Sequence, residues 1–264
     1  MDLVYKKAGS RELMLTYLPP INKSCKLAPL YFLIPGGGWH HENRESMFEF
    51  SADSVNALRK KGFSAVSIDY RVTSDGITNM YNILEDCFDA LCFIADNADK
   101  LKIDKNNISL SGHSAGGYLA LMLGYCDCAL FSKNKKDYTI RSIAAMSPPT
   151  VLYDNKTHRL QGGLEAAFKK DSSETALKAA SPVEYVSKDA PATLLIAGTS
   201  DWLVYANSAE ILYDKLKACG AKCELLLSVC GGHCFEKVIK TIEPNPNITE
   251  IQMKITEFCI KYSK

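Results

Sequence analysis

The chain has 264 residues, 47% of them hydrophobic and 23% charged, so it is long enough for one large domain with a substantial core. Its 31 basic and 30 acidic residues leave a formal net charge of +1, which gives no reason to expect nucleic acid or an anionic membrane surface as a partner. The ten cysteines form no C-x-x-C pair, so neither a zinc ribbon nor a disulfide framework is predicted, and we expect most of them to be reduced thiols.

The start of the sequence does not predict export. The first residues lack the basic start, the long apolar stretch and the small-residue cleavage site of a signal peptide. No apolar run approaches the roughly 18 residues that a membrane-spanning helix needs. We therefore expect a cytoplasmic protein that does not bind a membrane.

Residues 3–18 predict an antiparallel hairpin, because apolar and polar residues alternate there around a turn at residues 8–10. Short, continuous apolar runs follow and are typical of strands buried on both faces: residues 30–34, 63–68, 108–110, 143–146, 193–197 and 223–229. Segments with helical spacing separate most of these runs and close the chain: residues 48–61, 80–95, 115–125, 205–218 and 248–262. The pattern predicts an α/β fold with a doubly wound, mostly parallel sheet and an antiparallel N-terminal hairpin.

We expect residues 1–264 to form a single domain. Two stretches, near 127–138 and near 150–181, fit the strand and helix pattern poorly, and we interpret them as insertions over the edge of the sheet. In an open α/β sheet, ligands bind outside the carboxyl ends of the strands. The turns that follow the strands are therefore where a functional site is expected.

One such turn carries the pattern of a nucleophilic serine. The apolar run at residues 108–110 leads into S-G-H-S-A-G-G at residues 111–117, and a helical segment starts at once. A serine hydroxyl raised above a sheet needs a sharp, strained turn, and glycines two residues before and after it remove the side chains that would collide. Gly112 and Gly116 fill these positions, so Ser114 is the candidate nucleophile.

A serine hydroxyl needs a neighbouring base, most often an imidazole. Of the five histidines, His40 and His41 precede the serine, and His158 lies in an irregular stretch. His113 is adjacent to the serine and is expected to point away from it across the turn. His233 follows the last predicted strand in the sequence C-G-G-H-C-F and is therefore the candidate base.

The imidazole in turn needs a carboxylate that fixes its tautomer. The apolar run at residues 193–197 ends in G-T-S-D-W, which places Asp201 at the same edge of the sheet. Asp201 is the candidate acid. Its alternative role is to cap the helical segment that follows, in which case Asp189 or Asp171 is the weaker candidate for the acid.

The glycine run after the first parallel strand suits an oxyanion hole. The sequence P-G-G-G-W at residues 35–39 lets backbone N–H groups approach a substrate oxygen closely. We expect Gly37 to donate with either Gly36 or Gly38, and the N–H of Ala115 to contribute from the other side. The run lacks the Lys-Ser/Thr ending of a P-loop and the G-x-G-x-x-G spacing of a dinucleotide site, so a nucleotide is not predicted.

Four aromatic residues lie near the predicted strand ends and are candidates for the substrate pocket: Trp39, Tyr70, Tyr118 and Trp202. Aromatic residues in an α/β protein are also common in the core, so both readings stay open. No set of histidines, carboxylates and thiols has the spacing of a metal site, and neither a metal nor a cofactor is predicted.

These motifs together resemble the α/β-hydrolase superfamily, and within it the esterases related to hormone-sensitive lipase, whose loop H-G-G-G-[WF] differs from P-G-G-G-W only at the first position. The resemblance is closer to bacterial acetyl, acetylxylan and feruloyl esterases, which often carry P-G-G-G-[YW], a following charged stretch such as residues 43–45, and G-[FH]-S-A-G-G. It continues through I-D-Y-R at residues 68–71, I-D at 103–104, S-P-P at 147–149 and S-P at 181–182, and so covers nearly the whole chain.

The resemblance implies an α/β-hydrolase fold with the chain order Ser114, Asp201, His233, and the corresponding roles of nucleophile, orienting acid and general base. The chain departs from the classical branch at Pro35, where that branch has histidine, and at His113, where it has aspartate. The substrate rules of that branch therefore do not carry over.

The sequence thus predicts a serine esterase that acts through an acyl-enzyme on short-chain esters, with acetyl esters of carbohydrates as the expected substrates. Its expected partner is a small-molecule ester, and its oligomeric state is open. An arylformamidase or other small-amide hydrolase is the alternative enzyme, because kynurenine formamidases share Ser-Ala-Gly-Gly. A catalytically silent binding protein with the same fold is the alternative from another class.

Overall fold

The computed structural model describes residues 1–22, 27–134, 136–169 and 172–263 of the chain. The predicted hairpin is present as strands β1 (Asp2–Ala8) and β2 (Arg11–Leu18), which pair antiparallel and place Ala8 opposite Arg11. β2 then pairs antiparallel with β4, so the hairpin extends one edge of the main sheet.

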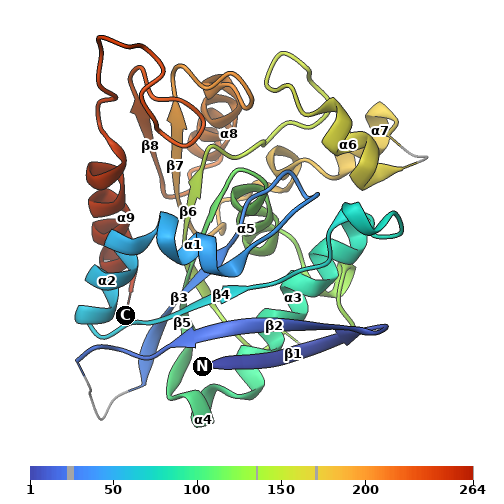
Figure 1. The fold of residues 1–264 in the computed structure, drawn as a ribbon, viewed down its shortest axis with the longest axis vertical. Coiled ribbons are helices and arrows are strands. Elements are labelled where there is room, and N and C mark those ends of the chain that lie inside the picture. The colour runs from blue at the N-terminus through green and yellow to red at the C-terminus, as the bar shows by residue number, and fades with distance from the viewer. Residues whose placement is uncertain (23–26, 135, 170–171, 264) are drawn as a thin grey trace.

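Within the described residues, the strands form one sheet in the order β1-β2-β4-β3-β5-β6-β7-β8 (Figure 1). The six strands from β4 to β8 in this order are all parallel to their neighbours within that group. They are β3 (Ala28–Ile34), β4 (Ser64–Ile68), β5 (Ile103–His113), β6 (Ile140–Met146), β7 (Ala192–Gly198) and β8 (Cys223–Ser228). Most residues of β3, β4, β6 and β7 are buried, as expected for strands covered on both faces. The predicted α/β fold is confirmed.

Helices cover both faces of the sheet (Figure 1). One face packs against α1 (Arg44–Phe50), α2 (Ala52–Lys60) and α9 (Ile248–Tyr262). The other packs against α3 (Met80–Asp96), α5 (Ala115–Tyr125) and α8 (Ala206–Ala218). Because α5 is apolar on all sides and its first nine residues are buried, it forms the centre of the larger core.

Some boundaries differ from the sequence-based prediction. The predicted helix at 48–61 is two helices that meet at Ser51. β5 begins at Ile103, five residues before the predicted run, because the polar residues 104–107 hide the strand pattern. A short helix, α4 (Ala98–Leu101), precedes it and was not predicted.

The two predicted insertions follow α5 and β6. The stretch near 127–138 contains a 3-10 turn, η2 (Cys128–Leu130), and Lys135 within it lies outside the described residues. The stretch near 150–181 contains α6 (Gln161–Phe168) and α7 (Glu174–Ala179), and the helices there escaped prediction because they are short. A further 3-10 turn, η3 (Pro182–Tyr185), leads into β7, and η1 (Thr73–Asp75) follows β4.

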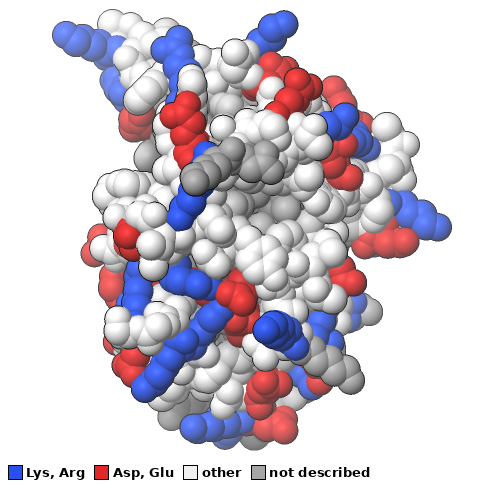
Figure 2. Space-filling model, turned by 90° about the vertical axis from the view of Figure 1, so that its right-hand side faces the viewer, with Lys and Arg blue, Asp and Glu red and all other residues white. Residues whose placement is uncertain are grey.

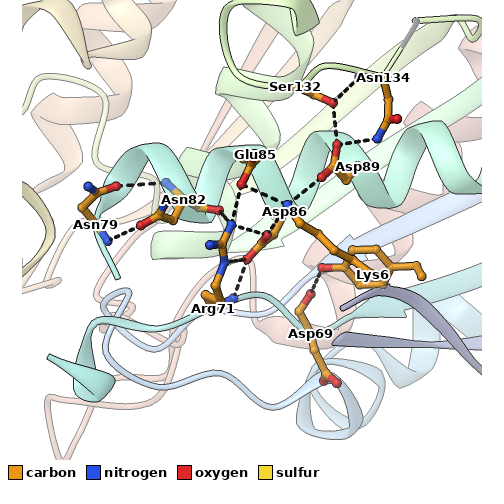
Figure 3. A network of polar contacts seen from close by, with 11 residues as sticks. Lys6, Asp69, Arg71, Asn79, Asn82, Glu85, Asp86, Asp89, Ser132 and Asn134 are labelled. Carbon is orange, nitrogen blue, oxygen red and sulfur yellow. Dashed lines mark hydrogen bonds and ion pairs between the residues drawn. The ribbon is translucent and has the colours of Figure 1, made fainter. Parts of the chain in front are cut away.

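A buried carboxylate ties the hairpin to the helical layer (Figure 3). Asp86 on α3 has no exposed side-chain surface, and it accepts hydrogen bonds from the backbone N–H of Arg71 (3.0 Å) and from its guanidinium (2.7 Å). The Lys6 ammonium of β1 lies 2.8 Å from the same carboxylate. Because buried charges need partners, this cluster fixes β1, the segment after β4 and α3 relative to one another.

The network continues along α3 to the stretch after α5 (Figure 3). Asp89 is 2.6 Å from the Lys6 ammonium and accepts hydrogen bonds from Ser132 and Asn134. Glu85 also contacts both cations, and these interactions hold its pKa below its usual value although burial opposes them. Three separate segments therefore converge on α3.

Basic and acidic side chains alternate over the face in Figure 2, with an uncharged area near its centre, so this face carries no large field of one sign. Across the part of the chain that the structure describes, no helix is both long and apolar enough to cross a membrane.

We expect Asp86→Asn to lower the free energy of unfolding by about 3–5 kcal/mol, because it leaves two cations beside a buried group that no longer carries charge. Urea denaturation followed by circular dichroism measures this change.

Glu224→Gln is the matched control. Glu224 also contacts two cations, Lys254 and Lys261, but at a partly exposed surface where such pairs contribute up to about 1 kcal/mol. Equal losses in the two variants would contradict a structural role specific to Asp86.

Candidate active site

Ser114 alone forms the turn between β5 and α5. β5 ends at His113 and α5 begins at Ala115, so the chain reverses direction at one residue. The backbone of Ser114 has φ 56° and ψ −121°, a conformation that a residue with a side chain adopts only under strain. This is the strained turn that the motif predicts, and it leaves Ser114 6% exposed at the carboxyl edge of the sheet.

The two flanking glycines are required by close backbone contacts. A Cβ at Gly112 would lie 2.2 Å from the carbonyl oxygen of Gly116, and a Cβ at Gly116 would lie 2.1 Å from the carbonyl oxygen of Ile34 on β3. Neither neighbour can move without breaking the sheet or the helix. The turn therefore depends on glycine at both positions, as expected from the sequence.

The structure brings the three predicted residues into one hydrogen-bonded row. His233 Nδ1 lies 2.7 Å from a carboxylate oxygen of Asp201, and His233 Nε2 lies 2.9 Å from Ser114 Oγ. Because a carboxylate only accepts, Nδ1 carries the proton and the neutral ring keeps Nε2 as an acceptor. The serine hydroxyl is then the donor to Nε2.

Asp201 makes two kinds of contact at once. Its Oδ2 faces His233, while its Oδ1 accepts hydrogen bonds from the backbone N–H groups of Leu203 (2.8 Å) and Val204 (3.0 Å). These bonds close a turn that precedes α8 (Ala206–Ala218). Asp201 does not cap that helix, because Tyr205 is its N-cap residue and no side chain caps it. The buried carboxylate therefore takes the first of the two roles considered from the sequence. Asp189 is exposed and has no recorded contact with the histidine, and Asp171 lies outside the described residues.

The glycine loop after β3 lies against the turn at Ser114. Gly37 and Gly38 have φ values of 119° and 60°, which favour glycine, and a Cβ at Gly36 would lie 2.7 Å from the carbonyl oxygen of His113. Within the described residues, the N–H groups of Gly37 and Gly38 donate no hydrogen bond. The N–H of Ala115 is at the first turn of α5, where helical partners are lacking. The three glycines and Ser114 line the same cavity.

A cavity of about 630 Å³ opens over Ser114 and His233. The glycine loop at residues 36–38 lines it, and its apolar lining residues are Met47 and Phe50 from α1, with Leu203 and Cys234. His41, Glu42, Asn43 and Ser46 give it a polar side. These lining residues were not predicted from the sequence, because they come from three separate segments: the loop and helix after the glycine run, the loop after β7 and the loop after β8.

The structure places three of the four predicted pocket aromatics in the core instead. Trp39, Tyr70 and Tyr118 have no exposed surface and belong to the larger hydrophobic core, because large rings gain most from burial. Trp39 packs edge-on against Tyr118 at 5.3 Å between centroids, and the Tyr70 hydroxyl donates to the carbonyl of Pro35 (2.8 Å). Trp202 is 60% exposed and does not line the cavity.

Two further titratable groups line the cavity. Burial, followed by the positive charge that His233 can carry, lowers the pKa of His113 to about 4, so its ring is neutral near pH 7. Burial and the Asp69 carboxylate raise the pKa of Glu42 well above its usual range, although the Arg11 guanidinium is 2.7 Å from Glu42 and opposes the shift. In the sequence, the only indication of a role for either residue is its place: His113 lies in the motif around Ser114, and Glu42 lies shortly after the glycine run at 35–39.

Comparison with known proteins identifies the family. The model of the BD-FAE family matches residues 14–216, which is most of the chain. The chain belongs to the BD-FAE family. The match includes Ser114 and Asp201 and ends before His233.

Several relatives of this chain are named esterases. Esterase LipC of Mycobacterium tuberculosis is 26% identical over 222 residues, covering 80% of this chain and 54% of LipC. The chain spans about half the length of the curated relatives it matches.

Two solved structures share the fold over 99% of this chain: esterase 2 of Thermogutta terrifontis (TM-score 0.80, 22% identity, 93% of that chain) and a truncated carbohydrate esterase from gut microbiota (TM-score 0.80, 20% identity, 96% of that chain). These matches confirm the α/β-hydrolase fold for this BD-FAE chain, and with it the resemblance noted in the sequence.

We expect Gly112→Ala to abolish the folded state or to lower its free energy of unfolding by more than about 4 kcal/mol, because its Cβ would collide with backbone on α5. Gly162→Ala is the control: its Cβ meets nothing within 4 Å and it lies in a helix, so it should be neutral or stabilising by up to about 1 kcal/mol. Thermal unfolding compares the two, and a Gly112→Ala protein as stable as the wild type would refute the close contact.

Proposed function

We propose that the chain is a serine hydrolase of carboxylic esters, in which Ser114 is the nucleophile, His233 the general base and Asp201 the orienting acid. The observation that carries this proposal is the continuous row of two hydrogen bonds, 2.7 and 2.9 Å long, at a strained turn that faces a cavity. The named esterases among its relatives support the reaction class.

In acylation, Ser114 Oγ attacks the ester carbonyl carbon while its proton passes to His233 Nε2. Asp201 keeps the other ring nitrogen protonated and stabilises the imidazolium. The oxyanion of the tetrahedral intermediate accepts hydrogen bonds from the N–H groups of the 36–38 loop and of Ala115. Collapse of the intermediate transfers the proton to the leaving alcohol and gives an acyl-serine.

Deacylation repeats these steps with water as the nucleophile. His233 removes a proton from water, the hydroxide adds to the acyl carbon, and Ser114 Oγ leaves with the proton that the imidazolium returns. The serine, the imidazole and the backbone N–H groups supply each required role, so we propose that the reaction uses neither a metal nor a cofactor.

We propose short-chain, acetyl-type esters of carbohydrates as the substrate class. The apolar lining residues Met47, Phe50 and Leu203 suit a small acyl group, and the polar lining residues of the same cavity suit a hydroxylated alcohol. The structural similarity to a protein named carbohydrate esterase supports this choice.

We expect Asp201→Asn to lower kcat by about 10⁴-fold with little change in KM. The asparagine oxygen still accepts the two turn N–H groups, but its NH2 group faces Nδ1 and favours the wrong imidazole tautomer. Steady-state hydrolysis of p-nitrophenyl acetate measures the effect. Asp189→Asn is the control at an exposed position, and a larger loss in this control than in Asp201→Asn would show that the acid is misidentified.

A substrate panel tests the substrate class. We expect acetylated sugars to be hydrolysed with kcat/KM at least about 10-fold above feruloyl esters and N-formylkynurenine, a difference that one good pocket contact supplies. Preference for N-formylkynurenine would make the chain a small-amide hydrolase. No hydrolysis of any ester, p-nitrophenyl acetate included, would favour a binding protein.

A further inference from the structure

The main-chain carbonyl of His233 accepts two side-chain hydrogen bonds. His113 Nε2 lies 2.8 Å from this oxygen and Ser147 Oγ lies 2.9 Å from it. A carbonyl oxygen has two lone pairs, so both bonds can form together. The bond from His113 also fixes its tautomer, since only a protonated Nε2 can donate.

The two donors come from the strands next to the proposed nucleophile. His113 is the last residue of β5 and directly precedes Ser114, and Ser147 directly follows β6. The backbone of Ser147 has a φ of 46°, although it is not glycine, and it is 1% exposed. Strain of this kind persists only where surrounding contacts hold the residue in place.

The other hydrogen bonds of the loop at 230–235 join it to the segment that carries Asp201, or they stay within the loop and the residues next to it. Cys230 N–H donates to Thr199 Oγ1, and Ser200 N–H donates to the Gly231 carbonyl. Among the described residues, three hydrogen bonds join this loop to β5, to Ser114 after it and to the residue after β6. One is the bond between His233 Nε2 and Ser114, and the other two are those at the His233 carbonyl.

The neutral state of His113 fits this position. Its ring centroid lies 4.8 Å from that of His233, which must become positively charged during the reaction. A second cation here would oppose that charge. Burial keeps the His113 ring neutral near pH 7, so it donates a hydrogen bond without adding charge.

We propose that His113 and Ser147 are positioning residues, which hold the backbone of His233 so that its Nε2 stays within hydrogen-bond distance of Ser114. The inference rests on the proposed function, because positioning matters only if His233 acts as the base. A displacement of about 1 Å can cost on the order of 100-fold in rate.

The test uses His113→Phe, Ser147→Ala and the double variant. It measures kcat and KM for the hydrolysis of p-nitrophenyl acetate, and it measures the thermal unfolding of each protein. Phenylalanine keeps a ring in the buried space and removes the donor. We expect each single variant to lower kcat about 10-fold and the double variant about 100-fold, with KM changed by less than about 3-fold. His113→Gln, which retains an N–H donor, should recover most of the lost rate.

Two controls remove equivalent bonds elsewhere. Ser111, like His113, is on β5, and Ser111→Ala deletes its buried hydrogen bond to the Ala144 carbonyl on β6. His158→Phe deletes a buried histidine bond to the Leu152 carbonyl. Both should retain kcat within about 2-fold at a comparable loss of stability. A general loss of packing would instead lower activity in these variants as well.

A spectroscopic measurement separates failure of this inference from failure of the proposed function. The Nδ1 proton between His233 and Asp201 should give a far-downfield NMR signal that broadens in the double variant, whether or not the protein hydrolyses esters. An unchanged kcat and an unchanged signal in the folded double variant would overturn the positioning role. If His113→Phe does not fold, Ser147→Ala alone decides by the same two measurements. An inactive wild type with the signal intact would instead overturn the proposed function.

Discussion

Ser114 has a backbone conformation, with φ 56°, that costs a residue with a side chain about 1–3 kcal/mol, and the surrounding structure must hold it there. Gly112 and Gly116 permit the turn because β5, α5 and β3 approach within distances that exclude a Cβ. The same close approach brings the glycine loop at 36–38 against the carbonyl of His113. One strained residue thus places a hydroxyl and a set of backbone N–H groups side by side.

The topology of the sheet explains why this happens between β3 and β5. These two strands are neighbours, yet the chain leaves β3 toward α1 and α2 on one face and leaves β5 toward α5 on the other. A crevice opens at such a point at the carboxyl edge of an open α/β sheet. The cavity over Ser114 occupies this crevice, and the loops after β7 and β8 bring Asp201 and His233 to it from the side. Residues far apart in sequence therefore meet because their strands are ordered in space.

The parts of the site that could be predicted from the sequence are those set by the local conformation of the backbone. Glycine spacing around Ser114 and the run at 36–38 reflect local steric needs, and buried parallel strands have a continuous apolar pattern that is easily recognised. The cavity walls and the positions of the aromatic rings depend on tertiary packing. Nothing local distinguishes Phe50, which lines the cavity, from Tyr118, which is fully buried. The contact of His113 with the loop of the proposed base was likewise missed, because it joins residues 120 positions apart.

The central claim is that Ser114 is a nucleophile activated by His233. Diethyl p-nitrophenyl phosphate tests it directly, because an activated serine Oγ displaces p-nitrophenolate and retains the diethylphosphoryl group. Intact-mass measurement with peptide mapping should find one such group per chain, on Ser114, with ester hydrolysis lost in proportion to labelling and no label in Ser114→Ala. Hydrolysis that continues at full rate after exposure to excess reagent, or a label on another residue that accounts for the loss, would contradict the account.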